Sequence, residues 1–157
     1  MELPSYFQRL FAYDAWGNRE SLASMDPAIP GIGRALKIFT HIVGAERVWL
    51  ARLRQQDTSL TSPWPELSAD ECRAAVDDLA QQWKEFLGGI TPERLDAAVV
   101  YRNTKGAEFQ TPLVDLLQHL VTHSAYHRGQ IAALVRLGGG KPAATDYVVY
   151  TRRFRDG

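Results

Sequence analysis

Four histidines are the residues whose type and spacing bear most directly on chemistry. They stand at positions 41, 119, 123 and 127 of a 157-residue chain. Side chains four residues apart on a helix project from one face, with Cβ atoms about 5–6 Å apart, so a His-x-x-x-His pair can present two imidazoles to one ion. His119 and His127 are two turns apart, about 12 Å along a helix axis, and cannot readily share a metal. A usable pair therefore contains His123.

Helical phase decides between the two possible pairs. Counting 100° per residue, His127 falls about 40° from the centre of the apolar stripe of its predicted helix, His123 about 80° and His119 about 120°. His123 and His127 thus point toward the rest of the protein, whereas His119 leans away. His41, on another predicted helix, lies roughly 80–90° from the centre of that helix's stripe. A groove between the two helices would bring His41, His123 and His127 together.

Three imidazoles favour particular metals. Used neutral as nitrogen ligands, they suit zinc, nickel, iron or copper better than magnesium or calcium, which prefer oxygen. Three protein ligands leave at least one coordination position open, as in catalytic rather than structural zinc sites. On spacing alone, the commoner explanation of such a pair is one core and one surface histidine.

The elements that must position these histidines form an all-α pattern. Four segments show helical periodicity and predict a four-helix bundle; they cover residues 3–25, 33–54, 68–88 and 111–137. The third begins at a capping box, Ser68 with Glu71. The fourth begins near Thr111 and Pro112, with proline in the first turn. Alternating residues between 97 and 110 predict a small hairpin between the third and fourth helices.

Loop lengths restrict the topology of the bundle. The first two helices, joined by about seven residues, are expected to be antiparallel neighbours. The stretch from Gln55 to Leu67 is a long crossover that can span the bundle, so that helices two and three run parallel. No repeat or second domain is visible, and residues 1–157 are expected to form one domain.

Composition excludes several classes of protein. Hydrophobic residues make up 45% and charged residues 23%, as in an ordinary globular protein. The 18 basic and 18 acidic residues cancel, which argues against a nucleic-acid partner, and the arginines at 152, 153 and 155 are interpreted as a solvated tail. No run approaches the roughly 20 apolar residues of a membrane span. The single cysteine, Cys72, suits a reducing compartment, and we expect a cytoplasmic protein.

Three segments together resemble a known family. Residues 116–131 read LLQHLVTHSAYHRGQI, residues 40–50 read THIVGAERVWL, and residues 13–18 read YDAWGN. They are similar, in order and over essentially the whole chain, to the markers of the DinB family, the small bacterial DinB/YfiT-like proteins regarded as metalloenzymes.

The resemblance implies a fold, a site and a class of reaction. It implies a bundle in up-down-down-up order and a divalent metal, with zinc or nickel favoured, held by His41, His123 and His127. Relatives include transferases and isomerases that use low-molecular-weight thiols such as bacillithiol or mycothiol, and many members have no assigned reaction. Members are often homodimers. Nothing in the chain suggests DNA binding.

Polar residues at core-facing positions are exceptions that need partners. Glu46 lies in the apolar arc of the second helix, and Asp14 and Asn18 lie on the apolar side of the first. Glu46 or Asp14 can accept a hydrogen bond from a ligand histidine or from Arg128, and would then tune the metal. The alternative is a structural contact that ties helices together.

Further candidates surround the histidines. Gln130 and Tyr126 flank the histidine pair and suit either substrate orientation or packing. Trp64, in the proline-rich crossover, can cover the mouth of the site. Cys72 on an apolar stripe is most simply a small hydrophobic residue.

Three hypotheses about function follow. The first is a divalent-metal-dependent enzyme in which the ion activates a thiol or water, as a thiol-dependent S-transferase or a related hydrolase or isomerase acting on a small molecule. The second is a non-enzymatic metal- or ligand-binding module that acts through a dimer surface. The third is an interaction scaffold in which the histidines are structural.

Overall fold

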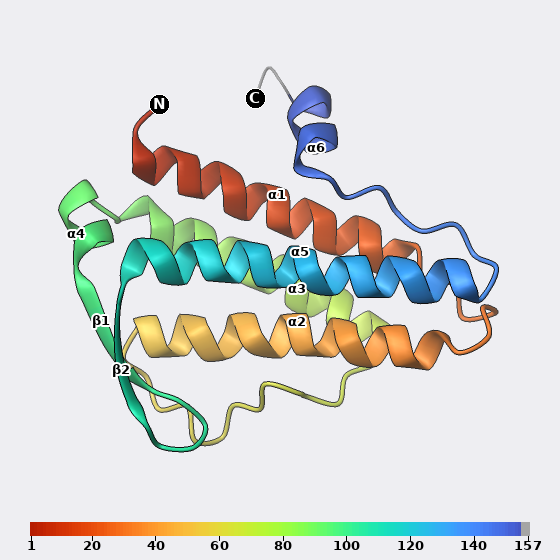
Figure 1. Ribbon diagram of the computed structural model, residues 1–157, viewed down its shortest axis with the longest axis horizontal. Helices are drawn as coiled ribbons and strands as arrows, with labels where there is room; N and C mark the ends of the chain where they lie inside the picture. Colours follow the sequence, from red (N-terminus) through yellow and green to blue (C-terminus); the bar gives the residue numbers. More distant parts are fainter. Residues whose placement is uncertain (155–157) are drawn as a thin grey trace.

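The computed structural model describes residues 1–154, which form six helices and one hairpin (Figure 1). The four long helices are α1 (Leu3–Ala23), α2 (Ile32–Leu53), α3 (Ala69–Gly88) and α5 (Leu113–Leu137). The short elements are α4 (Pro92–Asp96), β1 (Ala98–Arg102), β2 (Glu108–Pro112) and α6 (Tyr147–Arg153). The predicted all-α class is confirmed. Arg155 of the predicted arginine tail lies outside the described residues.

Local chemistry sets the starts of two long helices. The Ser68 hydroxyl accepts from the backbone N–H of Glu71 at 3.2 Å, and the Glu71 carboxylate accepts from the Ser68 N–H at 2.7 Å, so the predicted capping box is present. Pro112 is the last residue of β2 and precedes α5, with ψ of 142°. The fourth predicted helix therefore begins at Leu113, just after the proline.

The long helices form a four-membered ring. Helix α1 packs against α3 and α5, and α2 also packs against α3 and α5, so α1 and α2 lie opposite each other. Helices α1 and α5 run in one direction, and α2 and α3 in the other (Figure 1). The expectation that the first two helices are neighbours is wrong. Residues 24–31 join them across the bundle, since eight residues can extend to about 25 Å and the diagonal is within that reach.

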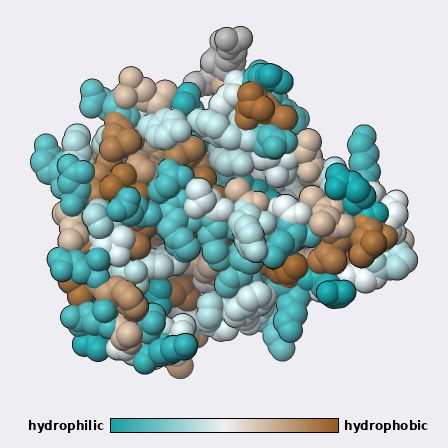
Figure 2. Space-filling model, viewed as in Figure 1, coloured by the Kyte–Doolittle hydropathy of each residue, from teal (hydrophilic) through white to brown (hydrophobic). Residues whose placement is uncertain are grey.

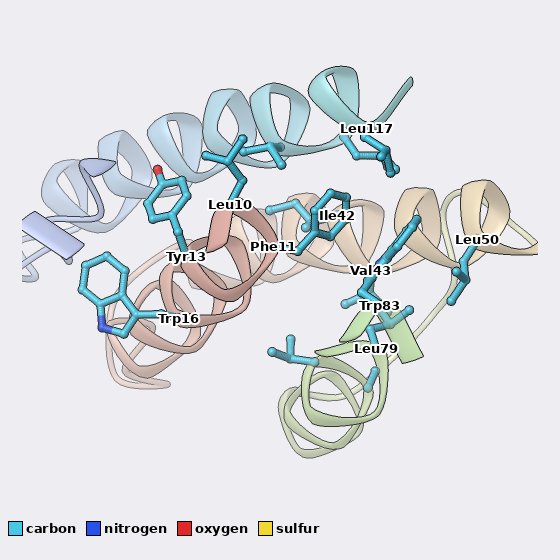
Figure 3. Close-up of a cluster of buried hydrophobic side chains, with 14 of the residues drawn as sticks. Leu10, Phe11, Tyr13, Trp16, Ile42, Val43, Leu50, Leu79, Trp83 and Leu117 are labelled. Carbon is cyan, nitrogen blue, oxygen red and sulfur yellow. The ribbon is translucent and has the colours of Figure 1, made fainter. Parts of the chain in front are cut away.

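Side chains from all four long helices meet in the core (Figure 3). The rings of Phe11 of α1 and Trp83 of α3 pack at a tilt of 44°, with centroids 4.5 Å apart. Ile42 of α2 and Leu117 of α5 are fully buried. Polar residues cover much of the face shown in Figure 2. Within residues 1–154, no helix is long and apolar enough to cross a membrane.

The hairpin between α3 and α5 is close to its predicted position. Strands β1 and β2 pair antiparallel, with Val100 opposite Gln110, and Gly106 in the turn has a φ of 80°. Tyr101 of β1 packs against Trp49 near the end of α2, with centroids 4.8 Å apart. The hairpin is thereby fixed against the bundle.

Two short helices have no counterpart in the sequence prediction. Helix α4 has five residues and α6 has seven, too few for a periodic apolar stripe to stand out. Helix α6 packs its aromatic side chains on α1; the rings of Tyr147 and Tyr13 lie 5.0 Å apart, edge to face.

Candidate metal centre

Three imidazoles converge in the groove between α2 and α5. The Nε2 atom of His41 lies 3.2 Å from Nε2 of His123, which in turn lies 3.2 Å from Nε2 of His127. The three half-buried side chains can each offer one ligand atom, and all of these atoms lie within 4.8 Å of one another. The structure thus brings together the three histidines that the sequence singles out.

His119 stands apart from this cluster. Its ring is exposed, 5.4 Å from the ring of His123 and 5.8 Å from that of Trp49, and it contributes no ligand atom. The helical phase of α5 accounts for the difference. His123 and His127 face α2, whereas His119, one turn earlier, points to one side of them, toward Trp49.

Hydrogen bonds fix the tautomers of the two outer rings. Nδ1 of His41 lies 2.7 Å from the backbone carbonyl of Pro63. A carbonyl can only accept, so this Nδ1 carries the hydrogen and Nε2 of the neutral ring carries a lone pair. Nδ1 of His127 likewise donates to the amide oxygen of Gln130 at 2.7 Å. Both rings therefore turn a lone pair toward His123.

This donor set fits a divalent cation. Around zinc, with metal–nitrogen distances of about 2.0–2.1 Å and tetrahedral angles, two ligand nitrogens lie roughly 3.3 Å apart. The 3.2 Å separations that His123 makes with each neighbour are close to that value. A hydrogen on Nε2 of His123 can be donated to only one of these lone pairs well, whereas a cation in its place would accept a lone pair from each of the three rings.

Burial favours the neutral form of His41 and of His123. The pKa of His123 is lowered to about 4, first by burial and then by the neighbouring rings of His127 and His41. Burial also lowers the pKa of His41, against the raising effect of the bond to Pro63. Because imidazole must be deprotonated to ligate a metal, these groups need not release a proton at neutral pH.

The crossover between α2 and α3 clamps His41. The Trp64 ring stacks on the imidazole with centroids 3.9 Å apart and planes 11° from parallel, and the preceding residue supplies the Pro63 carbonyl. Gly44 permits this close approach, since a Cβ there would lie 2.6 Å from the Pro63 oxygen and 2.5 Å from Cδ of Pro65. One helical ligand is thus oriented by a loop.

A cavity of about 860 Å³ lies between the first half of α2 and the end of the crossover. Trp64 forms part of its wall, together with Thr40, the neighbour of His41, and the apolar side chains of Leu36 and Leu67. Its lining contains one basic and one acidic side chain, Lys37 and Glu66. The volume suits a small molecule beside the histidine cluster.

Asp14, Glu46 and Arg128 form a separate buried network. Nη1 of Arg128 donates to Asp14 at 2.6 Å and to Asn18 at 2.8 Å. Glu46 accepts from Nδ2 of Asn18 and from Nε1 of Trp83, each at 3.0 Å. The contact between Asp14 and Arg128 is one that the sequence suggests. Within the described part of the chain, the hydrogen bonds of these groups do not reach a histidine, which agrees with the alternative that they tie helices together.

Burial perturbs both carboxyls of this network. It raises the pKa of Glu46 well above the usual value, and the charge of Asp14 adds to the effect. Burial also raises the pKa of Asp14, although the Arg128 guanidinium opposes the shift. A protonated Glu46 beside the ion pair of Asp14 and Arg128 leaves the network without net charge.

Of the two groups that contact the outer rings, sequence reasoning named Gln130, but for substrate orientation or packing and not for orienting His127, and it missed Pro63. Gln130 follows His127 by three residues, a helical spacing that can bring two side chains together, and this signal was available. Pro63 acts through its backbone carbonyl, and no side-chain pattern identifies such a group.

Comparisons with known proteins show to which family the sequence is similar. Residues 26–154 match the family model described as DinB family. The protein named Protein DinB from Bacillus subtilis (strain 168) is 38% identical over an alignment 157 positions long, which spans 90% of this chain and 91% of that protein. No solved structure matches.

Proposed function

Since this chain belongs to the DinB family, we propose that it binds one divalent metal ion through His41, His123 and His127 and acts as a metal-dependent enzyme. The observation that carries the proposal is the convergence of three Nε2 atoms in a donor set with an open side. Zinc and nickel are the metals we favour, because both accept three neutral imidazoles.

The chain's own residues have distinct roles in this proposal. The three imidazoles hold the ion, and Pro63 and Gln130 keep the rings of His41 and His127 in the ligating tautomer. A bound cation supplies Lewis acidity, which lowers the pKa of a thiol or water in the remaining coordination position. The cavity walled by Trp64 then holds the second reactant against the site.

The reaction we favour is transfer of a low-molecular-weight thiol to a small electrophile. The chain itself supplies no reactive thiol within the described residues, because Cys72 is fully buried and burial raises its pKa to about 11. A nucleophilic sulfur must therefore arrive with a substrate. Hydrolysis or isomerisation with activated water or thiol uses the same site. A cytoplasmic homodimer without a nucleic-acid partner stays a prediction.

Metal content tests the first step. Protein purified without a histidine tag is expected to contain close to one zinc or nickel ion per chain, and His123→Ala to contain only trace metal. His119→Ala is the matched control and should keep its metal. Metal at about 100 times its dissociation constant should stabilise the wild type by about 2.7 kcal/mol and leave His123→Ala unchanged. Equal metal content in both variants would exclude the site.

Turnover tests the second step. Metal-loaded protein is incubated with several low-molecular-weight thiols and a panel of electrophiles, and we expect conjugation that His41→Ala abolishes and His119→Ala retains. Stoichiometric metal without any such turnover would instead support the second hypothesis, a metal- or ligand-binding module.

A further inference from the structure

A second cavity, of about 470 Å³, lies where the start of the crossover, the end of α2 and the hairpin meet (Figure 1). The α2 side contributes Val48 and Arg52, and the hairpin contributes Arg102, Asn103 and Thr104. The crossover contributes the run from Thr58 to Pro63. This cavity contains none of the three clustered histidines and shares no lining residue with the cavity beside them.

Arg52 is a cation without a counter-ion. Its guanidinium lies over the ring of Trp49 at 4.7 Å and over that of Tyr101 at 5.6 Å, in a half-buried position. Within residues 1–154, no carboxylate forms an ion pair with it, and its buried Nε has no hydrogen-bond partner. A partly buried, unpaired charge is costly, so an anionic partner at this place would be stabilising.

The remaining lining of the cavity is rich in donors. Arg102 adds a second guanidinium; its ion pair with Glu108 is exposed on both sides, and such pairs contribute little. Asn103 accepts two backbone N–H groups through Oδ1, which leaves its amide nitrogen as a donor. Hydroxyl donors come from residues 58, 61, 62 and 104, whereas the Ser59 hydroxyl already donates to Asp57. The lining, all of it within the described residues, contains no acidic side chain.

Two arginines, an amide and several hydroxyls around a small cavity make a charge-assisted binding site for oxygen anions. We propose that this cavity binds a small molecule through a carboxylate or phosphate group held by Arg52 and Arg102. Arg52 is restrained by the two aromatic rings, so little side-chain entropy is lost when it engages the anion.

Pro63 links this anion site to the metal centre. The residue lines the cavity, and its carbonyl accepts the hydrogen of His41 Nδ1. A molecule anchored by its anionic group therefore contacts the segment that orients a metal ligand. The anion site does not depend on the proposed enzymatic function, because none of its donors is a histidine of the cluster.

Titration calorimetry with inorganic phosphate and with malonate tests the proposal at constant ionic strength. The wild type is compared with His123→Ala, which should lack the metal centre, and both are stripped of metal and then dialysed free of chelator. We expect saturable binding of at least one anion, equally strong in both proteins. Tighter binding of phosphate or of malonate identifies the preferred oxyanion.

Arginine variants locate the binding. Arg52→Gln should weaken it at least tenfold, and Arg102→Gln, at an exposed position that does not threaten folding, severalfold. Arg94→Gln on α4, an exposed arginine away from the cavity, is the matched control and should bind like the wild type. Absence of saturable binding, unchanged binding in both cavity variants, or an equal loss in Arg94→Gln would overturn the proposal. The titration is repeated after metal is restored to the wild type, and binding that appears only then would overturn the proposal and assign the anion to the metal centre.

Discussion

Nδ1 of His41 and the backbone carbonyl of Pro63, 22 residues apart in the chain, share a hydrogen bond of 2.7 Å. The bond joins a helix in the bundle to a loop outside it. It sets the tautomer of the histidine, and Trp64 stacked on the same ring sets its plane. The strength of the metal site is therefore expected to depend on residues that touch no metal.

Gly44→Ala tests this dependence. The added Cβ would lie 2.6 Å from the Pro63 oxygen, so the crossover must move away from His41. Loss of such an orienting contact lowers metal affinity about 10–100-fold. Metal competition titration measures the affinity, and the visible spectrum of the cobalt-substituted protein reports the geometry. A Cβ added at Gly33 on the same helix meets nothing within 4 Å, so Gly33→Ala should leave the metal affinity and the spectrum unchanged. If Gly44→Ala also has the affinity and spectrum of the wild type, the crossover does not orient His41.

Gln130→Ala removes the acceptor of His127 Nδ1. The ring is then free to rotate and to exchange tautomers, and we expect metal affinity to fall about tenfold or more. Gln130→Glu restores an acceptor and should recover most of the affinity, which separates orientation from general damage to α5. Gln118→Ala, an exposed position of the same helix, serves as the control. Wild-type affinity in Gln130→Ala would show that Gln130 has no orienting role.

Arg128→Met tests the interpretation of the buried network. It leaves Asp14 without its partner in a position of 3% exposure, and breaking such a pair costs about 3–5 kcal/mol of unfolding free energy. Chemical denaturation of the metal-free protein measures the loss. Metal affinity of the folded fraction should stay within about twofold of wild type, since the network makes no bond to the histidines. A large fall in affinity at unchanged stability would instead give Arg128 a role in tuning the metal.

Glu46 predicts a pH-dependent stability with a definite sign. Burial raises its folded pKa above 4.5, so its protonated form is the one favoured by folding. The stabilising contribution is complete below pH 4.5, the ordinary value, and is lost as pH rises through the higher folded pKa. Asp14, Arg128, Asn18 and Trp83 are the groups that face it.

The measurement compares the unfolding free energies of the wild type and of Glu46→Gln at a series of pH values from below 4.5 upward. Their difference removes the contributions of carboxyls that do not interact with Glu46, and it reports Glu46 together with its neighbour Asp14. The advantage of the wild type should decrease with rising pH. Glu85→Gln at an exposed position should show a constant difference. An advantage that grows with pH would mean that Glu46 is buried as a carboxylate.

Periodicity was sufficient for the long helices and for the choice among the histidines. Each helix buries an apolar stripe, and the angle of His119 from its stripe correctly separates it from His123 and His127. Loop length correctly predicted that α2 and α3 run parallel. It did not predict that α1 and α2 lie opposite each other, because the connection of residues 24–31 is long enough to reach either an adjacent or an opposite helix.

Groups that act through the backbone or without a side chain escaped prediction. Pro63 contributes a carbonyl, and Gly44 contributes the absence of a Cβ; neither carries a chemical signal in the sequence. The partners of Glu46 were also ambiguous, because core-facing position alone does not say which of several buried polar groups it meets. The structure supplies Asn18 and Trp83 instead of a histidine.

The crossover lies outside the four long helices. It nevertheless supplies the Pro63 carbonyl and the Trp64 indole that contact His41. The helices thus carry the three histidines, whereas the crossover carries the groups that orient one of them. Substitutions between residues 54 and 68 can alter how one ligand is presented, and which molecules approach it, at small risk to the folding of the four helices. Divergence among relatives that share the histidines is accordingly expected to concentrate there, as the place where a common scaffold acquires different reactions.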